Sequence, residues 1–215
     1  AYPSRTDIEL AQEPDAHYLL VSTREELTEP EIRSYRIVDG VVTEEPVRII
    51  DELPAVSVEP RDDGSTIVDL GQNMVGRVRL TVRGASAGQR IRLRFGEMLT
   101  SDGSLYVDNL RTAEATDIYI ARGHEIEVFE PRFTFHGFRY VEVTGYPGIL
   151  DSGDIVGRVL SNNTPEIGAF RCSDDLTNKL MSNIVWSQRG NFLGVPTDCP
   201  QRDERLGWMA DAQIF

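Results

Sequence analysis

Hydrophobic and polar residues alternate along most of the chain between residues 54 and 145. The clearest alternation puts Val78, Leu80 and Val82 on one side of an extended segment and arginines on the other. A period of two is typical of a β-strand that buries one face and exposes the other. Short runs of this kind are separated mostly by Gly, Asp or Ser, and they read AVSVEP, STIVDLG, GRVRLTVRG, QRIRLRFGEML and ATDIYIARG. We therefore predict a mainly β fold, with an antiparallel, jelly-roll-like β-sandwich over residues 51–150.

The polar face of two of these runs is rich in arginine. Such a face can bind carboxylates or stack against sugars. Because the chain carries a formal net charge of −13, ion pairs with acidic residues on neighbouring strands are the favoured interpretation. The arginines concerned are Arg77, Arg79, Arg90, Arg92 and Arg94.

An aromatic segment follows, from Glu130 to Gly145. Aromatic residues on a strand usually belong to the core. We predict this for Phe133, Phe135, Phe138 and Tyr140. His136 followed by Gly137 suggests a β-bulge where the chain bends. For His136 a structural role is favoured over one facing a catalytic domain.

The first fifty residues are acidic and interrupted by prolines, with a short strand-like run at Tyr18–Ser22. The dipeptide Asp39-Gly40 between two apolar runs predicts a hairpin. This region is interpreted as the tail of a preceding domain or as strands added to the sandwich, and the sequence does not decide between them. Residues 151–170 are expected to be a linker that contributes a strand.

The periodicity changes to helical after residue 171, where Leu176, Leu180 and Ile184 recur at four-residue spacing. Ser173 or Asp174 is the expected N-cap, and Gly190 the expected C-cap. We predict that residues 171–215 open an α-helical domain. The apolar stripe of this helix, which includes Trp186, needs packing partners that the chain supplies only in part.

The last stretch, VPTDCPQRDERLGWMADAQIF, combines several acidic residues with arginines and a tryptophan. Pro196 and Pro200 disfavour a helix before residue 201, so a helix is predicted from about Asp203. Such a helix would stack Glu204, Trp208 and Asp211 on one face. Asp198 and Arg202 would approach from the preceding loop.

This arrangement suits glycoside hydrolysis. A carboxylic acid kept protonated by burial or by neighbouring negative charge can protonate the glycosidic oxygen, and Glu204 is the candidate. An indole offers an apolar surface to a sugar. The alternative is a solvated helix end on which carboxylates pair with arginines and Trp208 is buried. Spacing alone also leaves open a retaining pair formed by Asp198 and Glu204.

The run TDCPQRDERLGWMADAQ resembles the signature of the bacterial α-L-rhamnosidases, a family of inverting glycoside hydrolases. DNLRTAEATDIYIARG and FEPRFTFHGFRYVEVTGYPG resemble the β-sandwich that precedes the catalytic barrel in that family. The resemblance implies that the chain carries this sandwich and the first two helices of a truncated (α/α)₆ barrel. It implies a rhamnose-containing glycoside as substrate and the remainder of the catalytic domain as a partner.

Carried over by position, the resemblance makes Glu204 the general acid. It assigns to the walls of the rhamnose pocket Asp198, Arg202, Asp203, Trp208 and Asp211. The family's general base is a glutamate far downstream, beyond Phe215. About 10 Å of axial rise between Glu204 and Asp211 on one helix also suits Asp211 to a substrate hydroxyl better than to the attacking water. The rival interpretation is a non-catalytic carbohydrate-binding or interaction module.

Composition limits the classes of molecule that the chain is expected to bind. The acidic balance argues against nucleic acid and anionic membranes, and no apolar run is long enough for a membrane span. Cys172 and Cys199 are too few for a disulfide scaffold, and Cys199 is expected to be packed and not nucleophilic. The scattered histidines do not suggest a metal site, and no cofactor is expected. No signal peptide is visible, which leans towards the cytoplasm, but the start at Ala1 indicates a piece excised from a longer protein.

Overall fold

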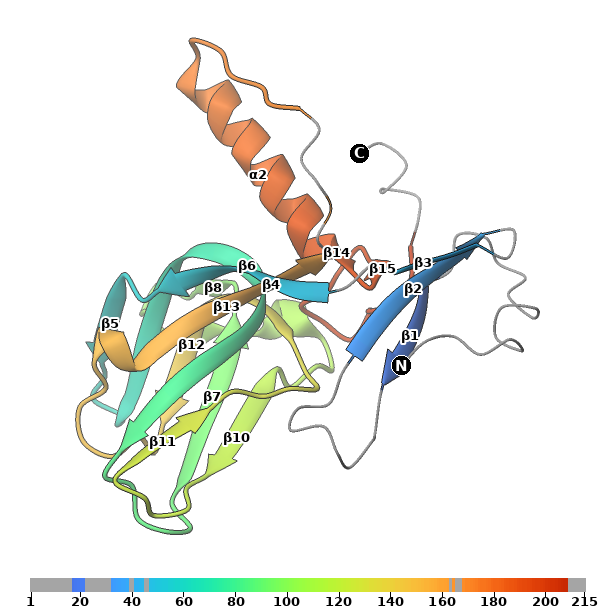
Figure 1. Ribbon diagram of the computed structural model, residues 1–215. Coiled ribbons are helices and arrows are strands. Elements are labelled where there is room, and N and C mark those ends of the chain that lie inside the picture. Colours follow the sequence, from blue (N-terminus) through green and yellow to red (C-terminus); the bar gives the residue numbers. More distant parts are fainter. Residues whose placement is uncertain are drawn as a thin grey trace. The chain divides into compact units, whose positions relative to one another are not determined.

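The computed structural model describes residues 17–21, 32–38, 41–44, 47–162, 164 and 168–208. The chain divides into two compact units (Figure 1). One comprises residues 49–160 with residues 198–206, and the other comprises residues 1–48, 161–197 and 207–215. The predicted sandwich and the segment that carries Glu204 therefore belong to the same unit.

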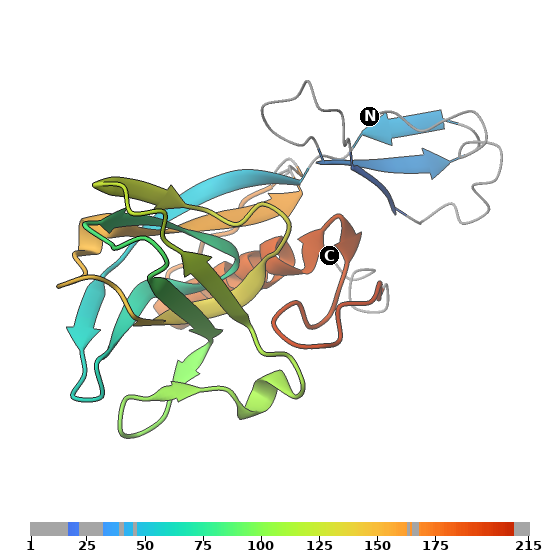
Figure 2. The ribbon, with the colours of Figure 1, turned by 90° about the horizontal axis from the view of Figure 1, so that it is seen from below.

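Eight strands form one antiparallel sheet, in the order β10-β7-β12-β6-β13-β4, with β5 and β11 paired to β6 outside this path. The sheet curls around its buried face (Figure 2). The prediction of a mainly β, antiparallel fold is confirmed. The strands are β4 (Val47–Pro54), β5 (Ser57–Pro60), β6 (Ser65–Arg83), β7 (Arg90–Gly96), β10 (Thr116–Ile120), β11 (Ile126–Phe129), β12 (His136–Thr144) and β13 (Ile155–Asn162).

Smaller elements connect these strands. A two-stranded ladder joins β8 (Met98–Leu99) to β9 (Leu105–Tyr106), and a 3₁₀-helix, η1 (Asp108–Leu110), follows it. A second 3₁₀-helix, η2 (Ser152–Asp154), leads into β13. The side chain of Asp151 caps η2 by accepting a hydrogen bond from the backbone N–H of Gly153.

Strand β6 organises the sheet, because two runs predicted as separate strands form one strand of 19 residues. The first half of β6 pairs with β5, and the second half pairs with β11 and β13. Strand β12 pairs with residues in both halves. The ladder with β12 is interrupted between Phe138 and Tyr140, whose partners on β6 are Met74 and Asp69. The predicted irregularity therefore lies at Arg139 and not at His136–Gly137.

An ion pair spans this irregularity. Arg139 donates through Nε and Nη2 to the two carboxylate oxygens of Asp69, at 2.8 and 2.7 Å. This contact holds the pKa of the Asp69 carboxyl below its ordinary value. The fork of the guanidinium matches the geometry of a carboxylate, so the pair fixes the two strands where the regular ladder stops.

The core follows the predicted alternation. Val78, Leu80 and Val82 are buried on β6, and Ile91, Leu93 and Phe95 are buried on β7. Among the four aromatic residues, Phe138 is fully buried, whereas Phe133 is 69% exposed. The core prediction was wrong for Phe133 because it lies in a bend before β12 and not on the strand.

His136 has the structural role that was favoured. Its ring is buried and stacks on Phe95, with 4.2 Å between ring centroids. Its Nε2 lies 3.0 Å from Oδ1 of Asp117, which is also buried. A buried, hydrogen-bonded ring of this kind contributes to packing and leaves β12 aligned with β7 and β10.

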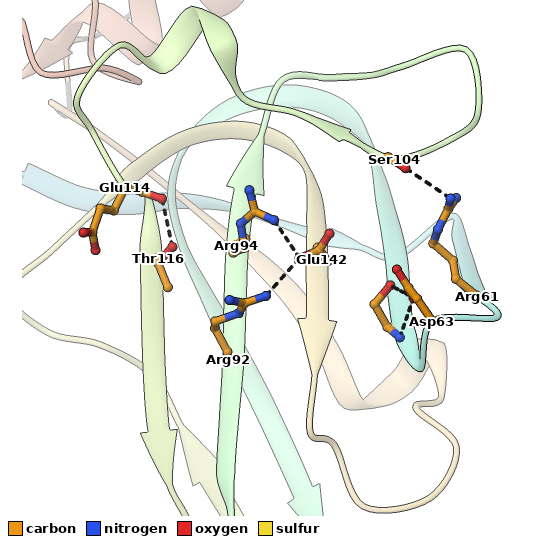
Figure 3. Close-up of polar contacts among 9 residues, drawn as sticks. Arg61, Asp63, Arg92, Arg94, Ser104, Glu114, Thr116 and Glu142 are labelled. Atoms are coloured by element: carbon orange, nitrogen blue, oxygen red, sulfur yellow. Dashed lines mark hydrogen bonds and ion pairs between the residues drawn. The ribbon is translucent and has the colours of Figure 1, made fainter.

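The arginine face makes ion pairs, as expected. Arg77 contacts Glu130 at 2.8 Å, and Arg79 contacts Glu52 at 3.1 Å. Arg92 and Arg94 reach the same carboxylate of Glu142, at 3.5 and 3.1 Å (Figure 3). Four of the five arginines therefore pair with acidic residues on neighbouring parts of the sheet.

The second unit contains a separate antiparallel sheet, in the order β1 (His17–Val21), β2 (Ile32–Val38) and β3 (Val41–Glu44). Val38 pairs with Val41, so the predicted hairpin is confirmed, although Asp39 and Gly40 themselves lie outside the described residues. The three strands are not part of the eight-stranded sheet. They therefore do not extend the sandwich.

The predicted helix is α2 (Asp175–Asn191), in the same unit as the three-stranded sheet. Asp174 is its N-cap and accepts hydrogen bonds from the backbone N–H groups of Leu176 and Thr177. The C-cap prediction was wrong, because Gly190 lies inside the helix and Phe192 ends it. Short strands β14 (Phe192–Leu193) and β15 (Val195–Pro196) follow.

One face of α2 is apolar and exposed. Leu176 is 78% exposed, and Leu180 and Ile184 are also exposed. These are the residues whose spacing predicted the helix, so the stripe is present without a full set of packing partners among the described residues. Among all the residues that the structure describes, no helix is long and apolar enough to cross a membrane.

Candidate active site

Residues 198–206 form a loop of turns and bends that packs on the sandwich unit. The prediction of a helix from about Asp203 is wrong for residues 203–208, and residues 209–215 lie outside the described part of the chain. The side chains supply the reason. Asp203 bonds Thr112, and Arg205 donates from Nη1 to the backbone oxygen of Phe135 at 3.0 Å. Contacts with the sandwich thus override the helical propensity of the segment.

Two arginines contact one oxygen of Glu204, Arg111 through a charged hydrogen bond and Arg202 through an ion pair. Nη1 of Arg111 lies 3.0 Å from Oε2 of Glu204, and Nη2 of Arg202 lies 2.9 Å from the same atom. The Glu204 side chain is 30% exposed, so it is partly shielded and still accessible. Both contacts leave Oε1 of Glu204 available for a ligand.

Asp198 lies beside Glu204. A carboxylate oxygen of Asp198, the Sγ of Cys199 and a carboxylate oxygen of Glu204 are all within 4.8 Å of one another. In the described part of the chain, this is the one group of possible metal ligands. Since two guanidinium groups already contact Glu204, the local charge does not favour a cation.

Two buried polar atoms of the loop have no hydrogen-bond partner within the described residues. They are Oδ1 of Asp198, an acceptor, and Nε of Arg202, a donor. Buried polar atoms are nearly always paired in proteins. A ligand hydroxyl, which both donates and accepts, is the type of group that matches such atoms.

Cys199 does not have the properties of a nucleophile. Burial and the adjacent Asp198 carboxylate raise the pKa of its thiol above the ordinary value. The thiol therefore stays protonated near neutral pH, and the thiolate is the reactive form. This agrees with the expectation of a packed cysteine.

Asp203 faces the sandwich through one oxygen. Its Oδ2 accepts hydrogen bonds from the backbone N–H of Thr112 at 3.3 Å and from the Thr112 hydroxyl. The hydroxyl contact is the main reason why the pKa of the Asp203 carboxyl lies below its ordinary value of 3.8. Asp203 is thus tied to the sandwich, and its predicted position in a pocket wall stays a prediction.

Replacing Thr112 by valine should raise the pKa of Asp203 towards 3.8, because the hydroxyl donor is lost. A carboxyl whose pKa is lowered on folding stabilises the fold above its unfolded pKa, and this stabilisation disappears as the pH falls through the folded pKa. The wild-type chain should therefore lose more stability than the variant between about pH 5 and pH 2. Carboxyl NMR titration and thermal unfolding measure both effects. Thr66→Val is the control, and an unchanged Asp203 pKa in the Thr112 variant would contradict the assignment.

Trp208 lies in the other unit, where its backbone N–H donates to the backbone oxygen of Pro196 at 2.9 Å. Its side chain is 48% exposed, so the alternative of a buried tryptophan is wrong. Asp211 lies outside the described residues. The structure therefore brings together Asp198, Arg202, Asp203 and Glu204, and it does not relate Trp208 to Glu204 by a helical turn.

Sequence reasoning missed the sandwich residues that contact the loop. Arg111, Thr112 and Phe135 come from segments about seventy to ninety positions upstream. No regular strand contains them, because Arg111 and Thr112 lie in a turn and Phe135 lies directly before β12. The available signal was their position inside the two upstream runs that resemble the family.

Comparison with protein families bears on the nature of this site. Residues 59–161 match the bacterial α-L-rhamnosidase concanavalin-like domain, and residues 165–215 match the bacterial α-L-rhamnosidase 6 hairpin glycosidase domain. The chain belongs to the bacterial α-L-rhamnosidase family. The two matches meet near the end of β13, so the loop with Glu204 lies in the part that matches the glycosidase domain.

Relatives of known name and structure agree with this membership. The chain is 55% identical over 170 residues to an α-L-rhamnosidase of Streptomyces avermitilis, covering 79% of this chain and 16% of the relative. It is 48% identical over 153 residues to an α-L-rhamnosidase of Formosa agariphila, covering 70% of this chain and 16% of that protein. The chain therefore spans about one sixth of these relatives.

Solved structures share the fold. A structure of the Streptomyces avermitilis α-L-rhamnosidase complexed with L-rhamnose matches with a TM-score of 0.76 and 54% identity, covering 80% of this chain and 16% of that one. The α-L-rhamnosidase from Dictyoglumus thermophilum also matches with a TM-score of 0.76, at 46% identity, covering 79% of this chain and 19% of that one.

A second kind of relative matches a shorter stretch. Fifty-two residues are 67% identical to the CysO-cysteine peptidase of Mycobacterium tuberculosis, covering 24% of this chain and 35% of that protein. The chain thus resembles two unrelated kinds of enzyme. The rhamnosidase family matches begin only at residue 59.

Proposed function

We propose that the chain is part of a glycoside hydrolase that removes terminal α-L-rhamnose by an inverting mechanism, with Glu204 as the general acid. The observation that carries the proposal is the position of the Glu204 carboxylate in the loop, where one of its oxygens lies within 4.8 Å of a carboxylate oxygen of Asp198 and Oε1 is not used by the arginine contacts. The loop lies in the segment that matches the rhamnosidase glycosidase domain. The relative at 54% identity whose structure is complexed with L-rhamnose supports rhamnose as the sugar.

Substrate binding is assigned to the polar atoms around Glu204. Oδ1 of Asp198 would accept a hydrogen bond from a sugar hydroxyl, and Nε of Arg202 would donate one. Trp208, Asp203 and Asp211 are retained as pocket residues on the family resemblance alone, with the indole of Trp208 offered to the apolar face of the sugar.

The general base is proposed to come from outside residues 1–215. Inverting enzymes separate their two carboxyl groups by about 6.5–9.5 Å so that a water molecule fits between them. One carboxylate oxygen of Asp198 and one of Glu204 lie within 4.8 Å of each other, which is less than the spacing that accommodates such a water. Asp198 is therefore assigned to substrate binding, and the 215-residue chain by itself is expected to be nearly inactive.

The short separation also favours a second mechanism, because retaining enzymes hold their carboxyl groups about 5–5.5 Å apart. The stereochemistry of the product separates the two. With the complete reading frame and an aryl α-L-rhamnoside, ¹H NMR in the first minutes should detect β-L-rhamnose before mutarotation. Early α-L-rhamnose would replace the inverting assignment with a retaining pair of Asp198 and Glu204.

A non-catalytic carbohydrate-binding module is the alternative function. Calorimetry with rhamnose and the 215-residue chain addresses it directly. Loss of binding in Asp198→Ala supports the pocket described above. Unchanged binding in that variant would favour a binding surface on the sandwich.

We also propose that the residues before position 59 are the peptidase-like stretch, the tail of a preceding domain of another kind. The two rhamnosidase family models match only after this region, although the 170 residues matched to the Streptomyces avermitilis relative extend into its end, and its three strands form a sheet of their own. The exposed apolar face of α2 is correspondingly assigned to the remainder of the catalytic domain. Sequencing the transcript across residues 45–65 tests the first point, because separate transcripts for the two parts would refute a single fused chain.

A further inference from the structure

The turn after η1 has an unusual backbone. Arg111 adopts φ 57° and ψ −115°, and Ala115 adopts φ 40°. Residues with a Cβ rarely occupy positive φ, and such residues persist where surrounding contacts hold them. Leu110 is buried beside this turn, and the backbone N–H of Phe95 donates to the oxygen of Ala115 at 2.9 Å. The sandwich therefore holds the turn in a conformation that the chain would not adopt alone.

This turn presents two side chains to two consecutive acidic residues of the loop. Arg111 contacts Glu204 at 3.0 Å, and Thr112 contacts Asp203 through its backbone N–H and its hydroxyl. Two adjacent residues of the sandwich thus contact two adjacent residues of the loop. A single surface ion pair stabilises a structure little, but these neighbouring contacts together define the direction in which the Glu204 side chain points.

The loop is also held on the other side of Glu204. The guanidinium of Arg205 lies 4.5 Å from the ring centroid of Phe135 and donates to the backbone oxygen of the same residue. Gln201 packs against Gly137 so closely that a Cβ on Gly137 would come within 2.7 Å of it. Anchors at Gln201 and Arg205 therefore leave the Glu204 side chain little freedom beyond its own rotamers.

The contacts distinguish the two oxygens of Glu204. Arg111 donates a hydrogen bond to Oε2, Arg202 forms an ion pair with the same atom, and neither contact uses Oε1. In a carboxylic acid the carbonyl oxygen accepts hydrogen bonds and the hydroxyl oxygen donates one. A donor and a second guanidinium at Oε2 therefore favour the proton on Oε1, the oxygen that is free to face the substrate.

We propose that Arg111 of the β-sandwich is a positioning residue for the general acid, fixing Oε2 of Glu204 so that Oε1 delivers the proton. This inference rests on the proposed function of Glu204. In the step concerned, the Oε1–H bond breaks and the proton goes to the glycosidic oxygen. The bond from the anomeric carbon to that oxygen breaks as a water oxygen bonds to the same carbon and gives its proton to the general base, and the leaving alcohol keeps the electron pair. Arg111 acts only through Glu204 and does not touch the substrate.

The test compares leaving groups in the complete enzyme. Methyl α-L-rhamnoside releases an alcohol that must be protonated, whereas 2,4-dinitrophenyl α-L-rhamnoside releases a phenolate that leaves without a proton. In Arg111→Ala we expect kcat for the methyl glycoside to fall roughly 10- to 100-fold, as for a misplaced catalytic group. The kcat for the dinitrophenyl glycoside should change less than about threefold, because departure of the phenolate does not need the general acid. Arg111→Lys should recover part of the loss.

Controls separate the possible failures. Arg92→Ala removes another partly exposed, ion-paired arginine of the sandwich, and both substrates should react as in the wild type. Equal losses on both substrates in Arg111→Ala would mean a general structural role, and no loss on either would mean an idle surface contact. Each result overturns the inference. If Glu204→Gln itself fails to discriminate between the two glycosides, the proposed function is at fault and not the role of Arg111.

Discussion

Replacing Glu204 by glutamine in the complete enzyme should lower kcat for methyl α-L-rhamnoside about 10²- to 10⁴-fold, the range that general acid catalysis usually contributes. Glutamine keeps the shape of the side chain and can still accept the hydrogen bond of Arg111 on its carbonyl oxygen. It has no proton to give to the glycosidic oxygen. Rhamnose binding should therefore be largely retained while turnover is lost, which steady-state kinetics and calorimetry measure separately.

Glu114→Gln is the matched control for this experiment. Glu114 is an exposed glutamate three residues after Arg111, and its contact with Thr116 uses its backbone oxygen (Figure 3). The same chemical change there should leave kcat within about twofold, as for most surface substitutions. Turnover of the methyl glycoside by Glu204→Gln at the wild-type rate would remove Glu204 from the mechanism.

Gly76→Ala should produce the largest loss of stability in the sandwich. Gly76 lies on β6 between β12 and β13, paired with His136 on one side and Val159 on the other. A Cβ at this position would lie 2.0 Å from the backbone oxygen of Arg158. Because backbone on a paired strand cannot move as a side-chain end can, we expect a cost of about 3 kcal/mol or more, at the upper end of overpacking changes. Urea unfolding of the 215-residue chain measures it.

Gly168→Ala is the corresponding control, since a Cβ there meets nothing within 4 Å. It should change the free energy of unfolding by less than about 0.5 kcal/mol. A Gly76→Ala chain as stable as the wild type would mean that β6 and β13 are not as close as described. The comparison therefore tests the strand register at the centre of the sheet.

The sheet was predictable because its signal is local. Val78, Leu80 and Val82 alternate with arginines, and burial of one face of a strand demands that alternation whatever the strand pairs with. The hairpin at Asp39–Gly40 and the N-cap at Asp174 were predictable for the same reason, as each depends on a few adjacent residues. The merging of two runs into β6 was not, since nothing in the short segment between them signals a continued ladder.

The members of the candidate site stay a prediction, whereas its predicted helical geometry was wrong for residues 203–208. Asp198, Arg202, Asp203 and Glu204 were named from composition and from resemblance, and they do lie in one loop. The helical stacking of Glu204 with Trp208 failed because Asp203 and Arg205 bond to Thr112 and Phe135, residues remote in sequence. Likewise Gly190 continues α2, because a glycine near the end of a helical pattern is only a possible stop.

The packing of residues 198–206 on the sandwich has a consequence for biosynthesis. A chain leaves the ribosome from its N-terminus, and domains generally fold as units in that order. Residues 49–160 are thus able to fold before Glu204 has been synthesised. The turn at Arg111 and the segment at Phe135 before β12 would then act as a preformed template on which the nascent loop settles. Slow maturation of the sandwich should accordingly delay the docking of this loop, even when residues 198–206 have already been synthesised.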